Sequence, residues 1–415
     1  MPYTLSKGTH NKGMTNLVNW YGPINSLGYG CASIGYAVAL NEVLSKGSTA
    51  AELCAGEKVK YMPIGDPEKQ SHSYLKQHGL ETLSIHAPQS AFAVGFWHFQ
   101  ECDRIGDGKK RVILSTFEVD DFPQPLIDKL QPFDAIGTAS EWGCDILRRH
   151  FPNKPVLHVP HGTSSAVTTP GLDYTMSNPT EHWSSILDIY MEPETQVVSS
   201  MGKYEVRKGH REVLNAVLEI GKTRPIVLIA AWHNPFMFQN MPYFVMIERD
   251  MRPSQAITMD DTRVCVYEKN HAKVVLLGRF STPMKAMHNM VNAHLFLAPS
   301  YAEGWNLPLS DAMALGMPCV ATLCTAHLDY CTPENVFPLT NFTTEIAKDE
   351  TPFFSGNATW QRCDAKELVS QIDAAWGDNQ LCAAKGKLAE KSIRELDGWV
   401  VSANRIAEFL LTNGN

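Results

Sequence analysis

Short apolar runs that alternate with helical patterns constrain the fold of this chain more than any other feature. Each run is followed by a polar or glycine-containing loop and then by apolar positions at helical spacing. Short continuous apolar runs are typical of strands covered on both faces, and alternation with helices is typical of parallel sheets. The sequence therefore predicts an α/β chain with two doubly wound parallel sheets. The predicted strands form two series, at 16–20, 82–85, 111–115, 135–137 and 155–159, and at 197–200, 226–230, 274–277, 294–297 and 319–321.

The length of 415 residues exceeds what one ordinary hydrophobic core holds, so we expect two domains. A stretch rich in Ser, Thr and Pro separates the two series of strands and predicts the connection, with one short helix around 183–190. The segment 233–273 interrupts the second series and predicts an insertion. The expected organisation is a first domain over 1–165, a connection over 166–195, a second domain over 196–390, and a C-terminal helix over 391–415 that packs back on the first domain.

Composition bears on the partners and on the compartment. A net charge of −8 and a pI of about 6.0 argue against a protein whose affinity comes from neutralising phosphates along a nucleic acid. No run of about 18 apolar residues is present, so we expect no transmembrane segment. The N-terminus lacks an apolar stretch, so we expect no secretory signal. The ten cysteines form no CxxC pair, which is typical of reduced thiols and predicts a cytoplasmic protein.

The segment 299–318 is the sharpest motif, and it reads PSYAEGWNLPLSDAMALGMP. We expect a strand that ends near Pro299, then a loop, then a helix that begins near Pro308, a residue suited to the first helical position. Backbone N–H groups at the start of a helix bind phosphate oxygens. Glu303 and Asp311 lie on either side of this helix start, and carboxylates accept hydrogen bonds from the hydroxyls of sugars and ribose. Either residue alone fits an ordinary structural role, but the whole segment favours a binding site.

This segment resembles the signature of glycosyltransferase family 4, whose members are retaining enzymes of the two-domain GT-B fold. The family pattern is Pro-Ser, two or three residues, Glu-Gly-Phe-Gly-Leu-Pro, and a second acid eight residues after the first. The resemblance implies that Glu303 contacts the donor sugar and that Asp311 contacts the nucleotide ribose. This chain has Asp where Glu is usual, and Trp-Asn where Phe-Gly is usual. The loop residues that the resemblance assigns to the donor site are Gly304, Trp305, Asn306 and Leu307.

A second segment, 200–210, resembles the family pattern Gly-Arg, four residues, Lys-Gly. Its sequence is SMGKYEVRKGH, and it follows the first strand of the second series. The resemblance implies that Lys203, in the place of the Arg, and Lys208 hold the donor diphosphate, and that Arg207 shares this role. Fixed cations stabilise the negative charge that a leaving diphosphate gains in the transition state. Such a trio is more often a solvated loop, but its place after a strand favours the functional interpretation.

The first half resembles the family more loosely. A loop over 22–30 follows the first strand, and the resemblance implies that it closes over the donor through Gly28 and Gly30, since glycines permit close approach of the backbone. His86 follows the strand predicted at 82–85 and is the candidate for a catalytic histidine near the transferred sugar, with His98 as its rival. Glu118 and His98 are the candidates for contacts with the acceptor.

The resemblance implies transfer of a sugar from a nucleoside-diphosphate sugar, of UDP or GDP type, to a hydroxyl group with retention of configuration. It implies no metal and no cofactor besides this co-substrate, because the two lysines and the helix start replace the metal; Asp120-Asp121 and Asp260-Asp261 are the acidic pairs that would otherwise suggest one. The acceptor is a glycan, a small molecule or DNA. The alternatives are a DNA-modifying glycosyltransferase acting on hydroxymethylated bases, a nucleotide-sugar 2-epimerase, and a non-catalytic nucleotide-sugar binder. The sequence leaves the sugar, the acceptor and the oligomeric state open.

Overall fold

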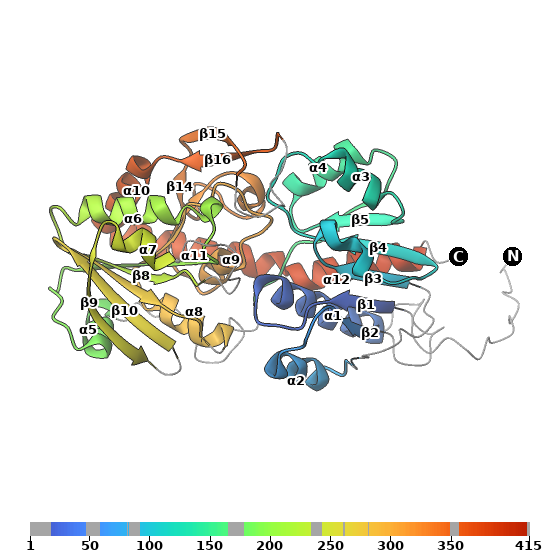
Figure 1. Cartoon of the computed structure of the whole chain (residues 1–415), viewed down its shortest axis with the longest axis horizontal. Helices are drawn as coiled ribbons and strands as arrows, with labels where there is room; N and C mark the ends of the chain where they lie inside the picture. Colours follow the sequence, from blue (N-terminus) through green and yellow to red (C-terminus); the bar gives the residue numbers. More distant parts are fainter. Residues whose placement is uncertain are drawn as a thin grey trace, which may run out of the picture.

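The computed structural model describes most of the chain, namely residues 18–46, 59–80, 82, 92–164, 178–233, 243–259, 262–280, 282–348 and 357–412. In this part of the chain two large sheets, each covered by helices, lie side by side (Figure 1). We call the first sheet with its helices the N-terminal half and the second the C-terminal half. The predicted fold class, two doubly wound α/β units, is confirmed.

The sheet of the N-terminal half has six parallel strands in the order β2-β1-β3-β4-β5-β6. Successive residues of a strand face opposite sides: in β4, Val112 and Leu114 pack on one face and Ile113 on the other. Helices cover both faces, so β1, β3 and β5 are wholly buried, whereas the residues of β6 are only partly buried. The strands are β1 (Val18–Gly22), β2 (Val59–Pro63), β3 (Phe92–Phe96), β4 (Lys110–Leu114), β5 (Ala135–Thr138) and β6 (Val156–His158). The helices are α1 (Gly28–Lys46), α2 (Lys69–Gln77), η2 (Phe99–Arg104), α3 (Gln124–Leu130) and α4 (Glu141–His150).

The sheet of the C-terminal half has eight strands in the order β14-β13-β12-β7-β8-β11-β10-β9. Its first six strands run parallel, and β9 and β10 extend it as an antiparallel pair. A separate hairpin pairs β15 with β16. The strands are β7 (Gln196–Met201), β8 (Ile226–Ala231), β9 (Arg252–Met259), β10 (Thr262–Lys269), β11 (Ala272–Leu277), β12 (Leu295–Ala298), β13 (Cys319–Thr322), β14 (Phe337–Leu339), β15 (Phe342–Ile346) and β16 (Thr359–Cys363).

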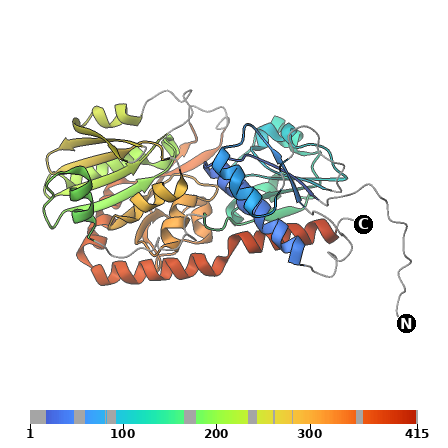
Figure 2. The same cartoon turned by 90° about the horizontal axis from the view of Figure 1, so that it is seen from below.

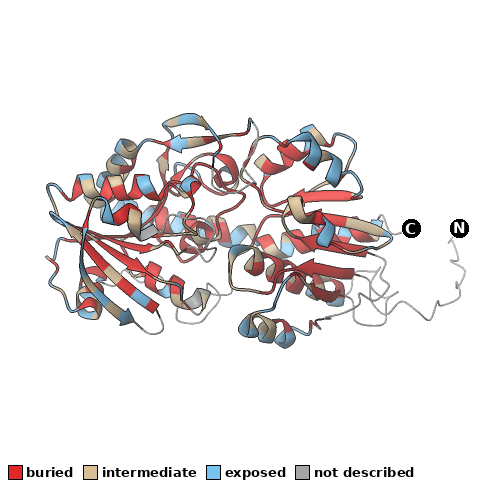
Figure 3. Ribbon diagram, in the orientation of Figure 1, coloured by how far each residue is buried: buried red, intermediate tan, exposed pale blue. Residues whose placement is uncertain are grey.

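Helices cover the two faces of this second sheet as well. The burial map of Figure 3 shows buried strands between helices that expose one side. The helical elements are α5 (Pro179–Leu187), η3 (Val206–Lys208), α6 (His210–Ile220), α7 (Tyr243–Glu248), α8 (Pro283–Val291), α9 (Leu307–Ala314), η4 (Thr325–Asp329), α10 (Ala365–Gly377) and α11 (Asn379–Leu396). None of the helices described is long and apolar enough to cross a membrane.

The comparison with the expected strands shows where sequence patterns fail. The runs at 111–115, 135–137 and 155–159 and all five runs of the second series coincide with strands. The strand expected at 82–85 lies outside the described residues except for Thr82, which forms an isolated parallel bridge with Tyr61. The strands β2 and β3 were not expected. The segment 233–273, interpreted as an insertion, supplies β9 and β10 and thereby continues the main sheet.

The last helix returns to the N-terminal half. Figure 2 shows α11 running beneath the C-terminal half and α12 (Gly398–Thr412) continuing beneath the N-terminal half. Ile406 and Leu410 are buried in the same cluster as Trp20 and Tyr36, so α12 completes the core of the first sheet. The start of α12 passes close to the chain at His161: a Cβ on Gly398 would lie 2.0 Å from the His161 carbonyl oxygen. Only glycine fits there.

Candidate functional site

The two motifs meet at the carboxyl ends of neighbouring strands. β7 and β12 pair directly, so the loop after β7, which carries Lys203 and Lys208, lies beside the loop after β12, which carries Glu303. The loop after β4 of the N-terminal half, residues 115–118, approaches them from the opposite side. Ligands of doubly wound sheets bind outside the carboxyl ends of the strands, so this is where a ligand is expected.

Glu303 is buried and accepts hydrogen bonds from three side chains. Lys208 Nζ donates to Oε1 at 2.6 Å, Ser300 Oγ donates to Oε1 at 2.8 Å, and Arg207 Nη1 donates to Oε2 at 2.8 Å. Burial by itself would raise the pKa of Glu303, but the Lys208 and Arg207 cations outweigh it and hold that pKa at about 2. Glu303 is therefore ionised at neutral pH and can only accept hydrogen bonds.

The basic side chains of the β7 loop are balanced by carboxylates. Lys203 pairs with Glu205 at 2.5 Å, Lys208 pairs with Glu303, and Arg207 pairs with Glu118, Glu205 and Glu303. Burial lowers the pKa of Lys208, although the charge of Glu303 beside it favours the protonated form. The charges of the three cations and the three carboxylates sum to zero. A phosphate that binds here therefore meets an electrically neutral cluster whose lysine ammonium groups can also contact the phosphate.

The start of helix α9 explains one departure from the family pattern. Asn306 is the N-cap and has φ = 82°, in the left-handed region that glycine and asparagine tolerate best. Its side chain accepts from the Leu309 amide at 3.4 Å, and its Nδ2 lies 3.1 Å from Nε2 of His327. His327 Nδ1 lies 2.9 Å from the Thr322 carbonyl oxygen, to which it donates, so Nε2 accepts from Asn306. Asparagine can therefore stand where the family has glycine.

Asp311 lies in α9 and faces the chain that leaves the N-terminal half. The backbone N–H of Ser164 donates to its Oδ1 at 2.8 Å. Burial raises the pKa of Asp311 to about 6, although the hydrogen bond from Ser164 acts in the opposite direction. A carboxylate kept in such a place carries a cost in folding free energy, which suits a residue retained for a ligand.

The residues predicted in the N-terminal half differ in their surroundings. The ring of His98 lies 4.1 Å from that of Tyr29, centroid to centroid, and burial followed by the charge of Lys203 lowers its pKa to about 4. His98 is thus brought to the cluster. Gly30 is required, since a Cβ there would lie 2.2 Å from the Asn25 carbonyl oxygen, whereas one on Gly28 would meet nothing within 4 Å. His86 lies outside the described residues.

Gly304 is a point of close approach between the halves. A Cβ on it would lie 2.7 Å from Cβ of Thr116 and 2.9 Å from the backbone nitrogen of Phe117. We therefore expect Gly304→Ala to push the two halves apart and to lower kcat by about 10- to 100-fold, because a displacement of about 1 Å has effects of this size. Gly377→Ala is the matched control, since its Cβ would meet nothing within 4 Å. An unchanged kcat for Gly304→Ala would mean that this contact is absent during turnover.

The described residues include no group of three or more His, Cys, Asp or Glu side chains arranged to hold a metal ion. Asp120 instead accepts hydrogen bonds from the backbone and the hydroxyl of Thr359, each at 2.6 Å, and the pair at 260–261 lies outside the described residues. The nine cysteines in the same part of the chain are free thiols.

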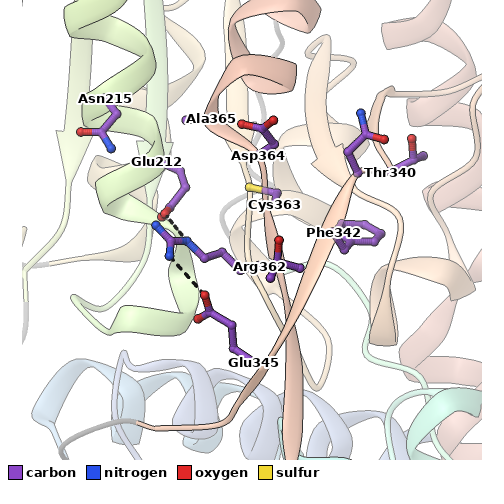
Figure 4. Close-up of a pocket in the computed structure, with 11 residues that line it drawn as sticks. Glu212, Asn215, Thr340, Phe342, Glu345, Arg362, Cys363, Asp364 and Ala365 are labelled. Carbon is purple, nitrogen blue, oxygen red and sulfur yellow. Dashed lines mark hydrogen bonds and ion pairs between the residues drawn. The ribbon is translucent and has the colours of Figure 1, made fainter.

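A polar pocket of about 640 Å³ lies apart from these residues, between α6, β15, β16 and the start of α10 (Figure 4). Arg362 spans it and pairs with Glu212 at 3.0 Å and with Glu345 at 3.2 Å. None of the residues predicted from the sequence lines this pocket.

Sequence reasoning missed three residues that complete the cluster. Glu205 lies between the predicted cations in the sequence, and its negative charge within that basic loop could have identified it. His327 and Tyr29 gave no signal, because they reach the site only through the tertiary fold: His327 orients Asn306, and the Tyr29 hydroxyl donates to the Thr116 carbonyl oxygen at 2.5 Å. The N-terminal wall of the site is thus fixed by an aromatic residue at the start of α1.

Comparisons with known proteins show which family and which solved structures the chain resembles. Residues 258–347, which include Glu303, match the family described as "Glycosyl transferases group 1". No curated protein sequence matches the chain. Among solved structures, the fold is shared with Anabaena HepE in complex with UDP-glucose, at a TM-score of 0.63 and 13% identity over 95% of this chain and 100% of that one.

Two further structures are similar. A glycosyltransferase from Rickettsia africae has a TM-score of 0.60 and 9% identity, covering 96% of this chain and 99% of that one. Sucrose-phosphate synthase from Thermosynechococcus elongatus has a TM-score of 0.58 and 12% identity, covering 95% and 98%. The resemblance indicated by the Glu303 segment is confirmed: the chain has the GT-B fold and resembles the glycosyltransferases of family 4, with residues 258–347 matching the group 1 glycosyl transferases.

Proposed function

We propose that the chain transfers a sugar from a nucleoside-diphosphate sugar, of UDP or GDP type, to an acceptor hydroxyl with retention of configuration and without a metal ion. The observation that carries the proposal is the Lys208–Glu303 pair, at 2.6 Å, with Lys203 beside it at the ends of neighbouring strands. HepE, which shares the fold, is described in complex with UDP-glucose and with UDP and glucose, and this supports a UDP-type donor.

The diphosphate belongs beside Lys203 and Lys208. The side chain of Lys203 is about one-third exposed, whereas that of Lys208 is mostly buried. Each is a compact charge with three donors, and can contact phosphate while keeping its carboxylate partner. The charge of the two lysines stabilises the leaving diphosphate, which is the role that a metal ion fills elsewhere.

Glu303 receives the sugar. A carboxylate has about four lone-pair positions, and Lys208, Ser300 and Arg207 occupy three of them, which leaves one for a sugar hydroxyl. Asp311 binds the ribose of the nucleotide. In the reaction the bond from the anomeric carbon to the phosphate oxygen breaks, and its electron pair leaves with the diphosphate. The acceptor oxygen bonds to the same face of that carbon, and its proton passes to the departing phosphate oxygen.

The acceptor lies on the N-terminal side. His98 is neutral at pH 7, because its pKa is near 4, and a neutral imidazole can accept a hydrogen bond from an incoming hydroxyl. His86 remains a candidate for a catalytic role. The acidic net charge disfavours DNA as acceptor and favours a glycan or a small molecule.

The test is release of nucleoside diphosphate from UDP-, GDP- and ADP-sugars, in EDTA and in Mg²⁺, with glycans or hydroxymethylated duplex DNA added. We expect release from one donor in EDTA, stimulated by a glycan, with the anomeric configuration retained in the product by NMR. Glu303→Gln should abolish release, whereas Glu395→Gln, at an exposed site, should not. Stimulation by DNA alone would replace the glycan with the DNA alternative. Binding without release, or epimerisation without transfer, would overturn the proposal.

A further inference from the structure

Arg207 is used differently from the lysines beside it. Its guanidinium is buried, and its two terminal nitrogens contact four oxygens. Nη1 donates to Glu303 Oε2 at 2.8 Å and to the Ala302 carbonyl oxygen at 3.1 Å. Nη2 forms ion pairs with Glu205 Oε2 at 2.7 Å and with Glu118 Oε1 at 3.2 Å. A guanidinium holds its donors in a rigid plane, so it cannot turn toward a phosphate without losing these partners.

The four partners come from both halves of the molecule. Glu205, Ala302 and Glu303 belong to the two loops of the C-terminal half, whereas Glu118 comes from the loop after β4 in the N-terminal half. The Arg207–Glu118 pair is therefore an ion pair across the interface between the halves. It is largely buried, since the side chains of Arg207 and Glu118 are 8% and 19% exposed. The pair of Arg279 and Glu68, which also joins the halves, lies at 45% and 35% exposure and is expected to contribute little.

Charge explains why Glu118 needs this partner. Burial, together with the charges of Glu205 and Glu303, raises the pKa of Glu118, and Arg207 opposes that rise. Three carboxylates thus surround one guanidinium, and the charge of each is tolerated through it. Separation of the halves would remove Glu118 and leave Arg207 with only the two carboxylates of its own half. The number of carboxylates that contact Arg207 therefore depends on whether the halves are together.

The same side chain fixes Glu303. Its Oε2 is held by Arg207 and its Oε1 by Lys208, so the plane of the carboxylate is set by two cations. We propose that Arg207 is a positioning residue that couples closure of the two halves to the orientation of Glu303, with Glu118 as the closure contact, and that it is not a ligand of the diphosphate. This inference rests on the proposed function for its kinetic consequences. It moves Glu118 from acceptor binding to closure, and Arg207 from the diphosphate to Glu303.

The kinetic test compares Glu118→Gln, Arg207→Lys and the double variant in the full-length protein. If closure is needed for chemistry, as we propose, Glu118→Gln should lower kcat by about 10- to 100-fold and leave the Kd of UDP or GDP, whichever the wild type binds, within about threefold. Arg207→Lys, which keeps the charge but not the planar fork, should do the same. The double variant should be no worse than about threefold below the poorer single variant, since both changes break one contact. Glu219→Gln, at a surface pair on α6, is the charge-matched control and should match wild type.

Small-angle X-ray scattering reads closure without activity. Glu118→Gln should increase the radius of gyration, and Glu219→Gln should not, provided that circular dichroism shows both folded. Unchanged kcat and radius in Glu118→Gln, or weaker nucleotide binding in Arg207→Lys of the size seen on removing Lys208, would overturn the inference. Failure of the proposed function has a different signature: the wild type itself would release no diphosphate, while the scattering comparison would still decide whether Glu118 holds the halves together.

Discussion

Replacing Lys208 by methionine is expected to lower kcat for sugar transfer by about 100- to 1,000-fold, the usual effect of removing one donor from a site where charge develops. Methionine keeps most of the buried aliphatic length and removes only the ammonium group. The remaining partners of Glu303, Arg207 and Ser300, keep that carboxylate in place. The loss should therefore appear in the leaving-group step, and it is measured as the initial rate of diphosphate release at saturating donor and acceptor.

Lys222→Met is the control for this variant. Lys222 lies just after α6, the helix that Lys208 precedes, and is more than half exposed in a pair with Glu219, so its removal should leave kcat unchanged. A donor with a better leaving group should recover part of the activity of Lys208→Met, because less charge then needs to be stabilised. A Lys208→Met enzyme with the wild-type kcat would remove the basis for placing the diphosphate at this lysine.

Asp311→Asn is expected to stabilise the folded protein at pH 8 while lowering its activity. The folded pKa of Asp311 is about 6 because of burial, whereas the unfolded value is about 3.9. The folded state thus binds more protons than the unfolded state between these values, and stability falls as the pH rises through that window. About two pKa units at about 1.4 kcal/mol each give a cost of roughly 3 kcal/mol above pH 6, which asparagine avoids while still accepting from Ser164.

The measurement is urea unfolding of wild type and variant across the pH range. The gain in free energy of unfolding for Asp311→Asn should be small near pH 4 and approach its full size by pH 8. The KM for the donor should rise at the same time, because an amide oxygen binds ribose hydroxyls less strongly than a carboxylate. A gain that does not depend on pH, or a variant with unaltered KM, would contradict the assignment of Asp311 as a buried ribose ligand.

Much of the fold follows from local pattern, and its failures have physical causes. Runs such as 226–230 are continuous and apolar, which identifies buried parallel strands. β2 was missed because Lys60 and Pro63 interrupt its apolar character; it lies at the sheet edge, where proline is tolerated. β3 contains Gly95, which reads as a break, but a Cβ there would lie 2.3 Å from the side chain of Ile105, so the glycine serves close packing.

Part of the site could likewise be predicted from the local sequence, and part depends on the tertiary fold. Glu303, Lys208 and Asp311 could be proposed as site residues from the sequence because each lies in a segment whose local order carries the information. The partnership of Arg207 with Glu118 could not, because 89 residues separate the two and only the contact between the halves joins them. His98 was a candidate from the sequence, but its approach to the cluster is visible only once β3 is placed beside β1 and β4.

Calorimetric titration of UDP and GDP into the intact protein tests the central claim most directly, namely that the Lys203–Lys208 loop holds a nucleoside diphosphate. We predict that one of the two binds in EDTA with a Kd in the range usual for KM values of enzymes, about 1 μM to 1 mM. We further predict that Lys208→Met weakens this binding at least about tenfold, a loss of about 1.4 kcal/mol, and that Lys222→Met does not. Absence of binding by either nucleotide, or equal affinity in wild type and Lys208→Met, would contradict this claim.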